Sequence, residues 1–500
     1  MLSLSLFIAP VLADNTLMLE PRDWRYNIMN TRLLEEVITR DVCVIGGGSS
    51  GIHAAVSLND LNKTVAVVEQ SGRLGGHTAT YIDPKTQTPI DFGVIIHQPL
   101  KELTGFFERF GIPLLNMSSG HWNRPGEPAN QSLPSVGYST FRKDVDFRNG
   151  AVVDRPVVDP AESLARMAEI ISRFPYILHG YTLPDPVPEE LYISFGTFLE
   201  RHNVTDVISV YYQFSQGMGD LLHLPTIYAI KYFNLGDLQA LKTGYFTAAT
   251  GNTAELYSRA GDYIGLQNIF LQSTVVAANR VVGTTVTGRP ELIISGPGTG
   301  LKLLSCSQIL LTIPPTMSNI GGWDLSEAER TTFSRFTLAN GYWTGLVTSV
   351  GLNESVTYWN AAATTPFKTP VLPALYALTP TGLLDDVWAV KFGANTPDLT
   401  DAQVQQMIQD EIRTLQHAFG SREASDTEDD KVKFLSFASH SPFMLQVTPE
   451  EIGHGFYTDL SSLQGGFGGT MFYSGATFHT HYTALLWHFN KEVVIPMMLR

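Results

Sequence analysis

The stretch Asp41-Val42-Cys43-Val44-Ile45-Gly46-Gly47-Gly48-Ser49-Ser50-Gly51 decides the fold at the start of this chain. Its apolar half is typical of a short buried strand, and residues 50–61 continue with the apolar spacing of a helix. A second apolar run covers residues 65–68 and ends at Glu69. This order predicts a strand–helix–strand unit of about 30 residues, in which a right-handed crossover joins two parallel strands.

Three glycines of this unit, Gly46, Gly48 and Gly51, have the spacing G-x-G-x-x-G between the predicted strand and helix. Gly46 permits a tight turn, Gly48 leaves room for a pyrophosphate, and Gly51 lets the helix pack closely on the strand. Ser50 lies in the first helical turn, where free N–H groups favour phosphate. Glu69 can accept hydrogen bonds from a ribose 2′-hydroxyl, which disfavours a 2′-phosphate. The unit is therefore predicted to bind a dinucleotide.

The stretch Arg73-Leu74-Gly75-Gly76-His77-Thr78 distinguishes FAD from a nicotinamide nucleotide. Gly75 and Gly76 permit a second close approach of the backbone to a diphosphate, and Arg73 adds a cation beside it. An ordinary turn would account for the two glycines but not for an arginine so near Glu69. We therefore expect non-covalently bound FAD.

These residues resemble the second motif of the flavin-containing amine oxidase superfamily, R-x-G-G-R-x-x-S/T, which Arg73, Gly75, Gly76 and Thr80 match. His77 replaces the second arginine. That departure resembles a fungal subgroup, the β-cyclopiazonate dehydrogenase family, in which Gly-Gly-His-Thr is followed by Thr-Tyr. Further stretches similar to the subgroup span nearly the whole chain, at residues 80–81, 91–94, 455–457, 463–465, 474–476 and 486–487.

The resemblance implies a set of cofactor contacts. The backbone of Val275 is expected to meet the adenine, while Gly475 and residues 481–483, including Tyr482, face the ribityl chain and the pyrimidine end of the flavin. A helix N-terminus there stabilises the anionic reduced ring. The full predicted set is Gly46, Gly48, Ser50, Gly51, Glu69, Arg73, Gly75, Gly76, His77, Val275, Gly475 and Tyr482.

The rest of the chain predicts an α/β protein, α+β overall, with a discontinuous Rossmann-like FAD-binding domain and an inserted mixed α/β substrate domain. The FAD-binding domain is expected at residues 40–95, 246–320 and 446–495, and the substrate domain at 96–245 and 321–445. The patterns predict helices over residues 160–174 (capped by Asp159), 189–202, 401–418 and 481–494, strands over 269–276, 291–294, 302–304, 309–313 and 471–475, a turn at 296–300 and an acidic surface loop at 421–430.

Charge and composition narrow the partners. The net charge is −15 and no run of Lys and Arg reverses it locally, which opposes binding to nucleic acid. Hydrophobic residues make up 44% and charged residues 16%, which is typical of a globular enzyme. No apolar run reaches the roughly 18 residues that cross a bilayer, so we expect no membrane span.

Residues 1–13 resemble a signal peptide, because they are almost wholly apolar and end in Val11-Leu12-Ala13. They carry no Lys or Arg, so the alternative is a frayed apolar tail. We expect the protein in the secretory pathway or outside the cell, with glycosylation candidates at Asn62, Asn116, Asn130, Asn203 and Asn353.

The two cysteines, Cys43 and Cys306, lie in apolar strand-like runs and are expected to be buried core thiols without redox or metal chemistry. His479 and His481 could suggest a metal, but no partnering cluster completes such a site.

The expected reaction is a two-electron oxidation of a small lipophilic substrate held against the flavin. Dioxygen is the expected acceptor, because no second dinucleotide motif is present. The catalytic base stays unassigned; His77 and His481 are candidates, although a single histidine is more often structural. Aromatic residues that could line the pocket are Tyr211, Tyr212, Phe214, Tyr342, Trp343 and Trp359.

The resemblance implies a role in fungal secondary metabolism, where dehydrogenation triggers ring closure of a terpenoid or prenylated intermediate. The alternatives are an amine or polyamine oxidase, a flavin-dependent isomerase, and an inactive flavin-binding carrier.

Overall fold

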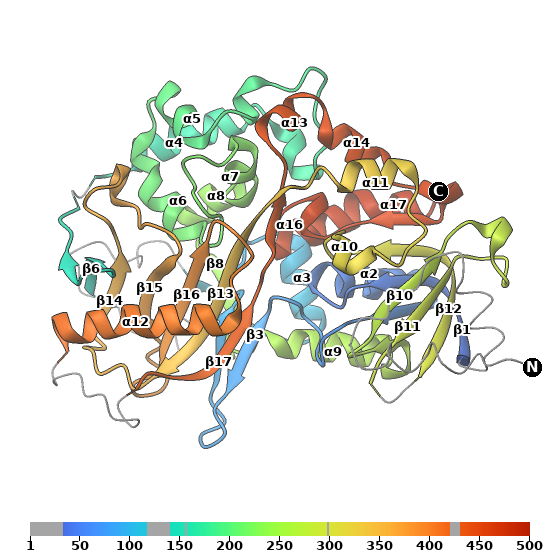
Figure 1. Ribbon diagram of the computed structural model, residues 1–500, viewed down its shortest axis with the longest axis horizontal. Coiled ribbons are helices and arrows are strands. Elements are labelled where there is room, and N and C mark those ends of the chain that lie inside the picture. The colour runs from blue at the N-terminus through green and yellow to red at the C-terminus, as the bar shows by residue number, and fades with distance from the viewer. Residues whose placement is uncertain (1–33, 118–140, 156–157, 298–299, 421–430) are drawn as a thin grey trace, which may run out of the picture.

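The computed structural model describes residues 34–117, 141–155, 158–297, 300–420 and 431–500. Two sheets form its two halves; many helices lie above them in the view of Figure 1, and others lie in front of and below them. The expected signal peptide at residues 1–13, the sequon at Asn130 and the acidic loop at 421–430 lie outside the described residues.

The first sheet has the order β10-β11-β12-β1-β2-β9, and β19 pairs with β12. Its strands β1, β2, β9, β12 and β19 are parallel to their neighbours in this group, while β11 runs antiparallel to β10 and β12. The helix α2 connects β1 to β2, which confirms the predicted strand–helix–strand unit. The bounds are β1 Leu34–Ile45, α2 Ser49–Asp60, β2 Val65–Val68, β9 Ile269–Phe270, β10 Thr274–Asn279, β11 Glu291–Ser295, β12 Leu301–Leu311 and β19 Met471–Tyr473.

Two strand predictions in this sheet were wrong. The strand predicted at 269–276 is two strands, since β9 pairs with β2 whereas β10 pairs with β11 at the other edge. The strands predicted at 302–304 and 309–313 are one strand, β12. The polar residues Ser305, Ser307 and Gln308 interrupt its apolar pattern. Ser305 is nevertheless buried with its hydroxyl 2.8 Å from the Thr287 hydroxyl, and the strand continues through all three.

The expectation of free core thiols was also wrong. Cys43 on β1 and Cys306 on β12 form a disulfide with their Cα atoms 5.8 Å apart, within the range that a disulfide needs. Both side chains are fully buried. The 263-residue separation between them hides the pairing in the sequence, because only the adjacency of β1 and β12 brings them together.

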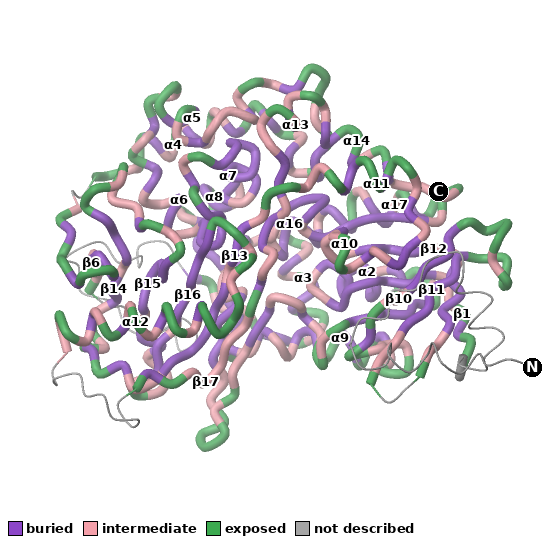
Figure 2. Tube along the Cα trace, in the orientation of Figure 1, coloured by how far each residue is buried: buried purple, intermediate pink, exposed green. Residues whose placement is uncertain are grey.

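The second sheet has the order β17-β13-β16-β15-β14-β6-β7, and β18 pairs with β13. The helix α12 packs on one face, against a core that includes Trp343, Trp388, Val390 and Phe392. Figure 2 shows β15 and β16 buried along most of their length and β17 only half-buried. The bounds are β6 Phe141–Asp146, β7 Ala151–Val152, β13 Leu338–Thr348, β14 Val356–Asn360, β15 Ala374–Pro380, β16 Trp388–Ala394, α12 Asp401–Phe419, β17 Lys433–Ser439 and β18 Phe443–Gln446.

Two separate two-stranded sheets accompany the two large ones. The hairpin of β3 (Ala79–Ile82) and β4 (Pro89–Gly93) packs Ile90 and Phe92 against Leu346, on the face of the second sheet opposite α12. The strands β5 (Leu114–Met117) and β8 (Tyr245–Ala248) form the other pair. The hairpin therefore connects the nucleotide segment to the second sheet.

Predicted helices occur with changed ends. The helix predicted at 160–174 is α4, Ala161–Ile171; Pro160 holds the N-cap position, and Asp159 accepts a hydrogen bond from the Ala161 N–H at 3.0 Å. The helix predicted at 189–202 is a short 3₁₀ turn followed by α5, because Ser194 caps a new start. The helix predicted at 481–494 consists of three consecutive segments: α16, a π-helical turn at Asn490–Val494, and α17.

The prediction at 401–418 is confirmed by α12. The helices not yet bounded are α3 Lys101–Arg109, α5 Phe195–Arg201, α6 Ile208–Phe214, α7 Thr226–Tyr232, α8 Leu235–Thr243, α9 Ala254–Ile264, α10 Met317–Ile320, α11 Glu327–Phe333, α13 Pro449–Gly453, α14 Phe456–Ser462, α15 Gly466–Gly469, α16 Thr483–Phe489 and α17 Ile495–Met498.

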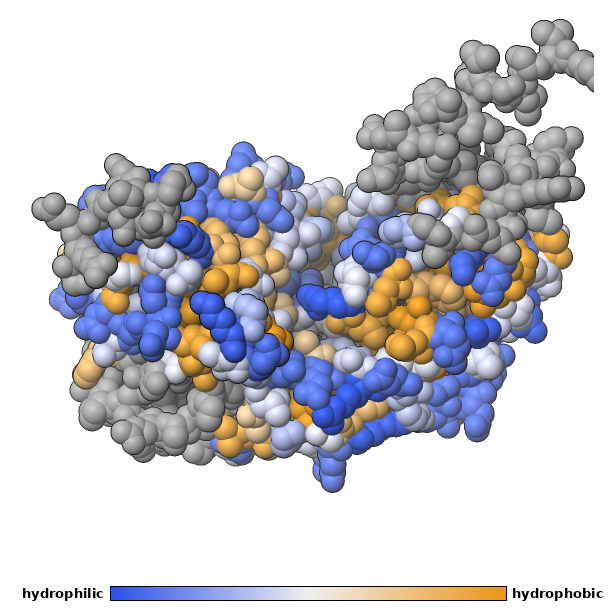
Figure 3. Space-filling model, turned by 90° about the horizontal axis from the view of Figure 1, so that it is seen from below, coloured by the Kyte–Doolittle hydropathy of each residue, from blue (hydrophilic) through white to orange (hydrophobic). Residues whose placement is uncertain are grey.

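The surface combines polar and apolar areas. Seen from below, the half that holds the first sheet shows the larger apolar area, beside residues that are not described (Figure 3). Among the described residues, no helix is both long enough and apolar enough to span a bilayer.

Candidate active site

The carboxyl ends of four parallel strands meet at one edge of the first sheet, the edge at which α/β proteins bind ligands. Gly46 follows β1, Glu69 follows β2, Thr312 follows β12 and Gly475 lies just after β19. All four residues line one cavity of about 790 Å³. The cavity continues from this edge to the second sheet, so it is shared by the two halves of the molecule.

The glycines at this edge have different roles. Gly46 has φ +111°, and a Cβ at Gly51 would lie 1.9 Å from the Gly46 carbonyl oxygen, so the turn itself requires both. A Cβ at Gly48 would meet no protein atom closer than 3.8 Å, although Gly48 lines the cavity. The space beside Gly48 is therefore left open to a ligand and is not filled by the protein.

The N-terminus of α2 faces the same cavity. Gly48 is its N-cap and provides no side chain, so the first-turn N–H groups can bind an anion, which the helix dipole also favours. The Ser50 hydroxyl is 2.9 Å from that of Ser474, and the Ser50 carbonyl accepts a hydrogen bond from Asn490. The Ser50 hydroxyl and carbonyl are thus engaged within the protein, and its backbone N–H is the group that can bind a ligand.

Glu69 is buried beside the glycine turn. Its carboxylate accepts hydrogen bonds from the Gly47 N–H at 2.7 Å and from the N–H and hydroxyl of Ser71 at 2.8 and 2.7 Å. A carboxylate has about four lone-pair sites, so one remains for a ribose hydroxyl. Its position fits the predicted role.

The second glycine stretch packs directly on the first. Gly75 donates its N–H to the Gly47 carbonyl at 2.9 Å, and a Cβ at Gly76 would lie 3.0 Å from the Gly48 Cα. The Arg73 guanidinium donates to the carbonyls of Gly76, at 3.0 Å, and Thr78, at 2.5 Å. Two backbone loops and one cation thus meet at the cavity, which suits the diphosphate of a flavin nucleotide.

Three histidines gather where these loops meet the second half of the molecule. The ring centroids of His77 and His481 are 5.3 Å apart, and those of His77 and His440 are 4.5 Å apart. Burial lowers the pKa of His77 to about 4, with a further contribution from Arg73, and it holds the pKa of His440 and His481 well below the usual value. All three are therefore neutral at physiological pH.

Hydrogen bonds fix two of these rings. The Nε2 atom of His481 accepts from the Met444 N–H at 3.0 Å, and Nε2 of His440 lies 3.0 Å from the Thr344 hydroxyl. Neither His440 nor Thr344 was predicted from the sequence. The stretch Ser439-His440-Ser441-Pro442-Phe443 offered a signal, a histidine between a polar strand end and an aromatic residue.

Aromatic side chains line the part of the cavity next to the second sheet. Phe214, Tyr342 and Trp359 lie there as expected, and Tyr232 and Phe443 were missed. The expectation was wrong for three other residues. Trp343 points to α12, where its Nε1 donates to Asp401 at 3.0 Å, Tyr211 packs on Phe195 and Phe233, and Tyr212 packs on Tyr376.

Of the three remaining residues predicted to contact FAD, two line the cavity and one does not. Gly475 and Tyr482 line the cavity; the Tyr482 hydroxyl donates to Asp237 at 2.8 Å, and burial raises the pKa of Asp237 to about 6. Val275 on β10 is not among the described residues that line the cavity, and its contact with adenine stays a prediction.

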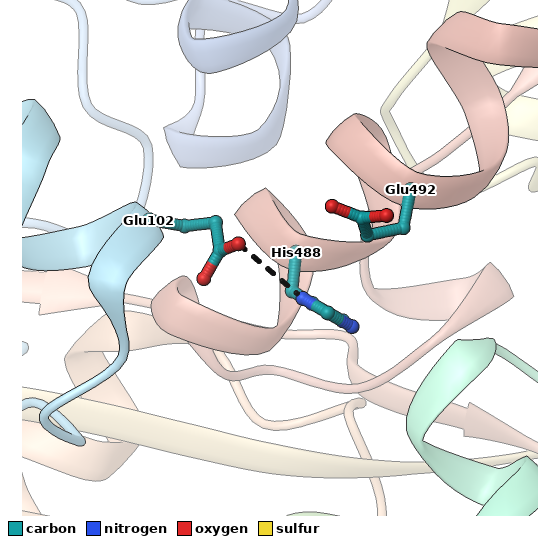
Figure 4. A group of neighbouring side chains, drawn as sticks. All are labelled: Glu102, His488 and Glu492. Atoms are coloured by element: carbon teal, nitrogen blue, oxygen red, sulfur yellow. Dashed lines mark ion pairs between the residues drawn. The ribbon is translucent and has the colours of Figure 1, made fainter.

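A separate group of polar side chains joins α3 to the last helices. Ligand atoms of Glu102, His488 and Glu492 lie within 4.8 Å of one another (Figure 4). The Lys491 ammonium lies 3.1 Å from a Glu102 oxygen and already provides a cation there. His479 is only two residues from His481 in the sequence, but its Nε2 lies 3.0 Å from the Leu178 carbonyl oxygen. We assign the Glu102 group to ion pairing.

Comparison with known proteins agrees with this geometry. Residues 44–110 match the family described as NAD(P)-binding Rossmann-like domain. The chain is 34% identical over 476 residues to FAD-dependent oxidoreductase oblC of Cochliobolus heterostrophus, covering 93% of this chain and 92% of the relative. It is 33% identical over 468 residues to beta-cyclopiazonate dehydrogenase of Aspergillus oryzae, covering 92% and 94%.

Solved structures show the same fold at low identity. A CLA-producing fatty acid isomerase from P. acnes superimposes with a TM-score of 0.69 at 16% identity, covering 91% of this chain and 98% of that one. Putrescine oxidase bound to putrescine gives 0.57 at 14% identity, covering 93% and 100%. The relatives, the glycine loops and the cavity lead to one conclusion. The chain belongs to the family of FAD-dependent oxidoreductases that includes beta-cyclopiazonate dehydrogenase.

Proposed function

We propose that this enzyme oxidises a lipophilic secondary-metabolite intermediate, such as a terpenoid or a prenylated alkaloid, by two electrons, in a dehydrogenation that is coupled to ring closure. The observation that carries the proposal is the single cavity that runs from the glycine loops to the aromatic side chains of the second half. A mostly apolar cavity with few polar groups is typical of a small-molecule site. Bound FAD would supply the acceptor for a hydride equivalent from an activated C–H bond of the substrate.

The residues proposed to hold FAD follow from the geometry above. Gly48 and the first turn of α2 would bind the phosphates, Glu69 the ribose, and Arg73 with Gly75 and Gly76 the other side of the diphosphate. Gly475 and Tyr482 line the far part of the cavity, where the predicted flavin contacts lie.

The chain's own residues would position the substrate and exclude water. Tyr342, Trp359 and Phe443 give the cavity an apolar wall, and three neutral histidines stand at its junction with the glycine loops. Of the two predicted candidates for the base, His481 already uses Nε2 to accept from Met444. The described residues make no hydrogen bond to the His77 side chain, so His77 is the better candidate for moving a proton.

We propose dioxygen as the electron acceptor and the secretory pathway as the location. The four described sequon asparagines, Asn62, Asn116, Asn203 and Asn353, are all exposed, and the Cys43–Cys306 disulfide suits an oxidising compartment. The apolar residues 1–13 support the same location.

Turnover of the FAD-loaded enzyme tests the proposal. We expect oxygen uptake with a complex lipophilic intermediate and none with putrescine or other simple amines. Oxidation of simple amines to aldehydes would favour an amine oxidase instead. Anaerobic conversion without any acceptor would identify an isomerase, and tight binding without flavin reduction would identify a carrier. A strict requirement for NADPH would reject dioxygen as the direct acceptor.

A further inference from the structure

Lys391 lies in the middle of β16, whose side chains point alternately to the core and to the cavity. Trp388, Val390 and Phe392 face the core against α12, whereas Ala389 and Lys391 line the cavity. The strand is otherwise apolar along this stretch, Trp388-Ala-Val-Lys-Phe-Gly-Ala394. A lysine on the cavity face of such a strand is a polar group set into an apolar wall.

The neighbours of Lys391 are small and uncharged. It pairs with Thr344 on β13 and with Ala377 on β15, and both residues also line the cavity. Cross-strand partners have Cβ atoms about 4.5–5.5 Å apart, so these short side chains leave room above them. The wall beside the lysine is therefore open to a ligand.

The Lys391 ammonium has no protein counter-ion within the part of the chain that the structure describes. The other charged groups of the cavity wall are bonded within the protein: Glu69 to Gly47 and Ser71, Asp91 to Thr80 and Thr253, Asp237 to Asn234, Tyr245 and Tyr482, and Arg73 to three backbone carbonyls. Burial alone lowers the pKa of Lys391 below its ordinary value of 10.5. An unpaired ammonium in such a site costs free energy that a bound anion can offset.

We propose that Lys391 binds an oxyanion of the substrate, a carboxylate or an ionised enol, and so selects acidic substrates. This inference rests on the proposed function and names a substrate class for the same cavity. Thr344, directly opposite Lys391, contacts His440, whose ring contacts His77. An anion held by Lys391 would therefore fix one end of the substrate close to the histidines, with its apolar part against Tyr342 and Trp359.

Binding of a matched pair of probes to the FAD-loaded enzyme tests the proposal. Phenylbutyrate and phenylbutyramide have nearly the same shape and differ in charge. Their dissociation constants are measured from the change in the flavin absorption spectrum and from the shift in Tm. We expect the acid to bind at least about tenfold more tightly than the amide, since a charge-assisted hydrogen bond is worth more than a neutral one.

Variants of the lysine locate the effect. Lys391→Met should abolish the preference for the acid, Lys391→Arg should keep most of it, and Lys85→Met, on the exposed turn between β3 and β4, should leave it unchanged. Without a probe, Lys391→Met should not lower Tm, because it removes an unpaired, half-buried charge. A lower Tm would indicate a structural partner and would contradict the proposal.

Other outcomes separate this inference from the proposed function. Equal binding of the two probes to the wild-type holoenzyme, a preference that survives in Lys391→Met, or no binding of the acid at millimolar concentration would overturn the role of Lys391. The proposed oxidation would stand in each of these cases. Failure of the protein to turn over any lipophilic substrate, with acid binding intact, would instead reject the proposed function alone.

Discussion

The imidazole rings of His77 and His481 are stacked, with centroids 5.3 Å apart and planes only 4° from parallel. His77 follows the second glycine stretch, whereas His481 precedes the last helices, and His440 from the second half contacts His77. The junction between the glycine loops and the aromatic wall is thus built from three distant parts of the chain. The low pKa values of these histidines therefore depend on the packing of all three parts at the junction.

Gly48→Ala should reduce FAD content without weakening the protein fold. A Cβ at this position would meet no protein atom closer than 3.8 Å, yet it would occupy space at the N-terminus of α2 in the cavity. We expect the apoprotein Tm to stay unchanged and the FAD bound per chain to fall strongly. Gly105→Ala, on α3 with open space around its Cβ, is the control for a new methyl group. Full FAD occupancy in Gly48→Ala would contradict the proposed contact.

His77 should make the fold less stable in acid. Burial lowers its pKa from 6.5 to about 4 in the folded protein, so the unfolded chain binds more protons between these values. Stability that is present above about pH 6.5 is therefore lost as the pH falls towards 4. For His77 alone the loss at about pH 5 is about 2 kcal/mol.

The Tm of wild type and of His77→Gln, measured from about pH 7 to about pH 5, checks this expectation. The variant should lose less stability over that range than wild type, because it lacks the group that must be held neutral. Groups that do not contact His77 are common to both proteins and cancel in the difference, whereas His440 and His481 contact His77 and titrate together with it. Parallel pH profiles would show that His77 titrates normally.

The nucleotide unit could be predicted from sequence because its determinants are local. Gly46, Gly48, Gly51 and Glu69 lie within one strand–helix–strand unit, and each occupies the place that the spacing requires. The cavity wall could not be predicted in this way. Whether Trp343 or Thr344 faces the cavity depends on which side of the second sheet α12 covers, and this is decided by packing between segments far apart.

Two further features depend on sheet order. The Cys43–Cys306 disulfide requires β1 and β12 to be neighbours, and the position of Lys391 opposite Thr344 requires β13 to pair with β16. Neither pairing has a signature in composition or spacing. A lysine inside an otherwise apolar strand is nevertheless a sequence signal for a polar group in the cavity wall.

Thr344→Val should destabilise the protein by leaving His440 without its hydrogen bond. Nε2 of His440 lies 3.0 Å from the Thr344 hydroxyl, and both side chains are buried. Loss of one partner of a buried hydrogen bond costs about 1–3 kcal/mol. Thr344→Ser keeps the hydroxyl and should lose less, as measured by urea unfolding of the holoenzyme. Equal stability of Thr344→Val and wild type would show that the bond contributes nothing.

The disulfide should be present in the purified protein and should stabilise it. We expect no free thiol in the denatured, unreduced chain and two after reduction, measured by thiol titration. Replacing both cysteines by alanine should lower Tm, since closing a loop of this length contributes about 5 kcal/mol in the chain-entropy description. Two reactive thiols before reduction would contradict the disulfide and would show that Cys43 and Cys306 are free thiols.

The visible absorption spectrum of the purified, folded protein tests the central claim most directly. The glycine loops, Glu69 and Arg73 predict a yellow protein whose flavin spectrum persists through gel filtration and whose FAD is released when the chain is denatured. A correctly folded, colourless protein that takes up no FAD when it is supplied would contradict the account.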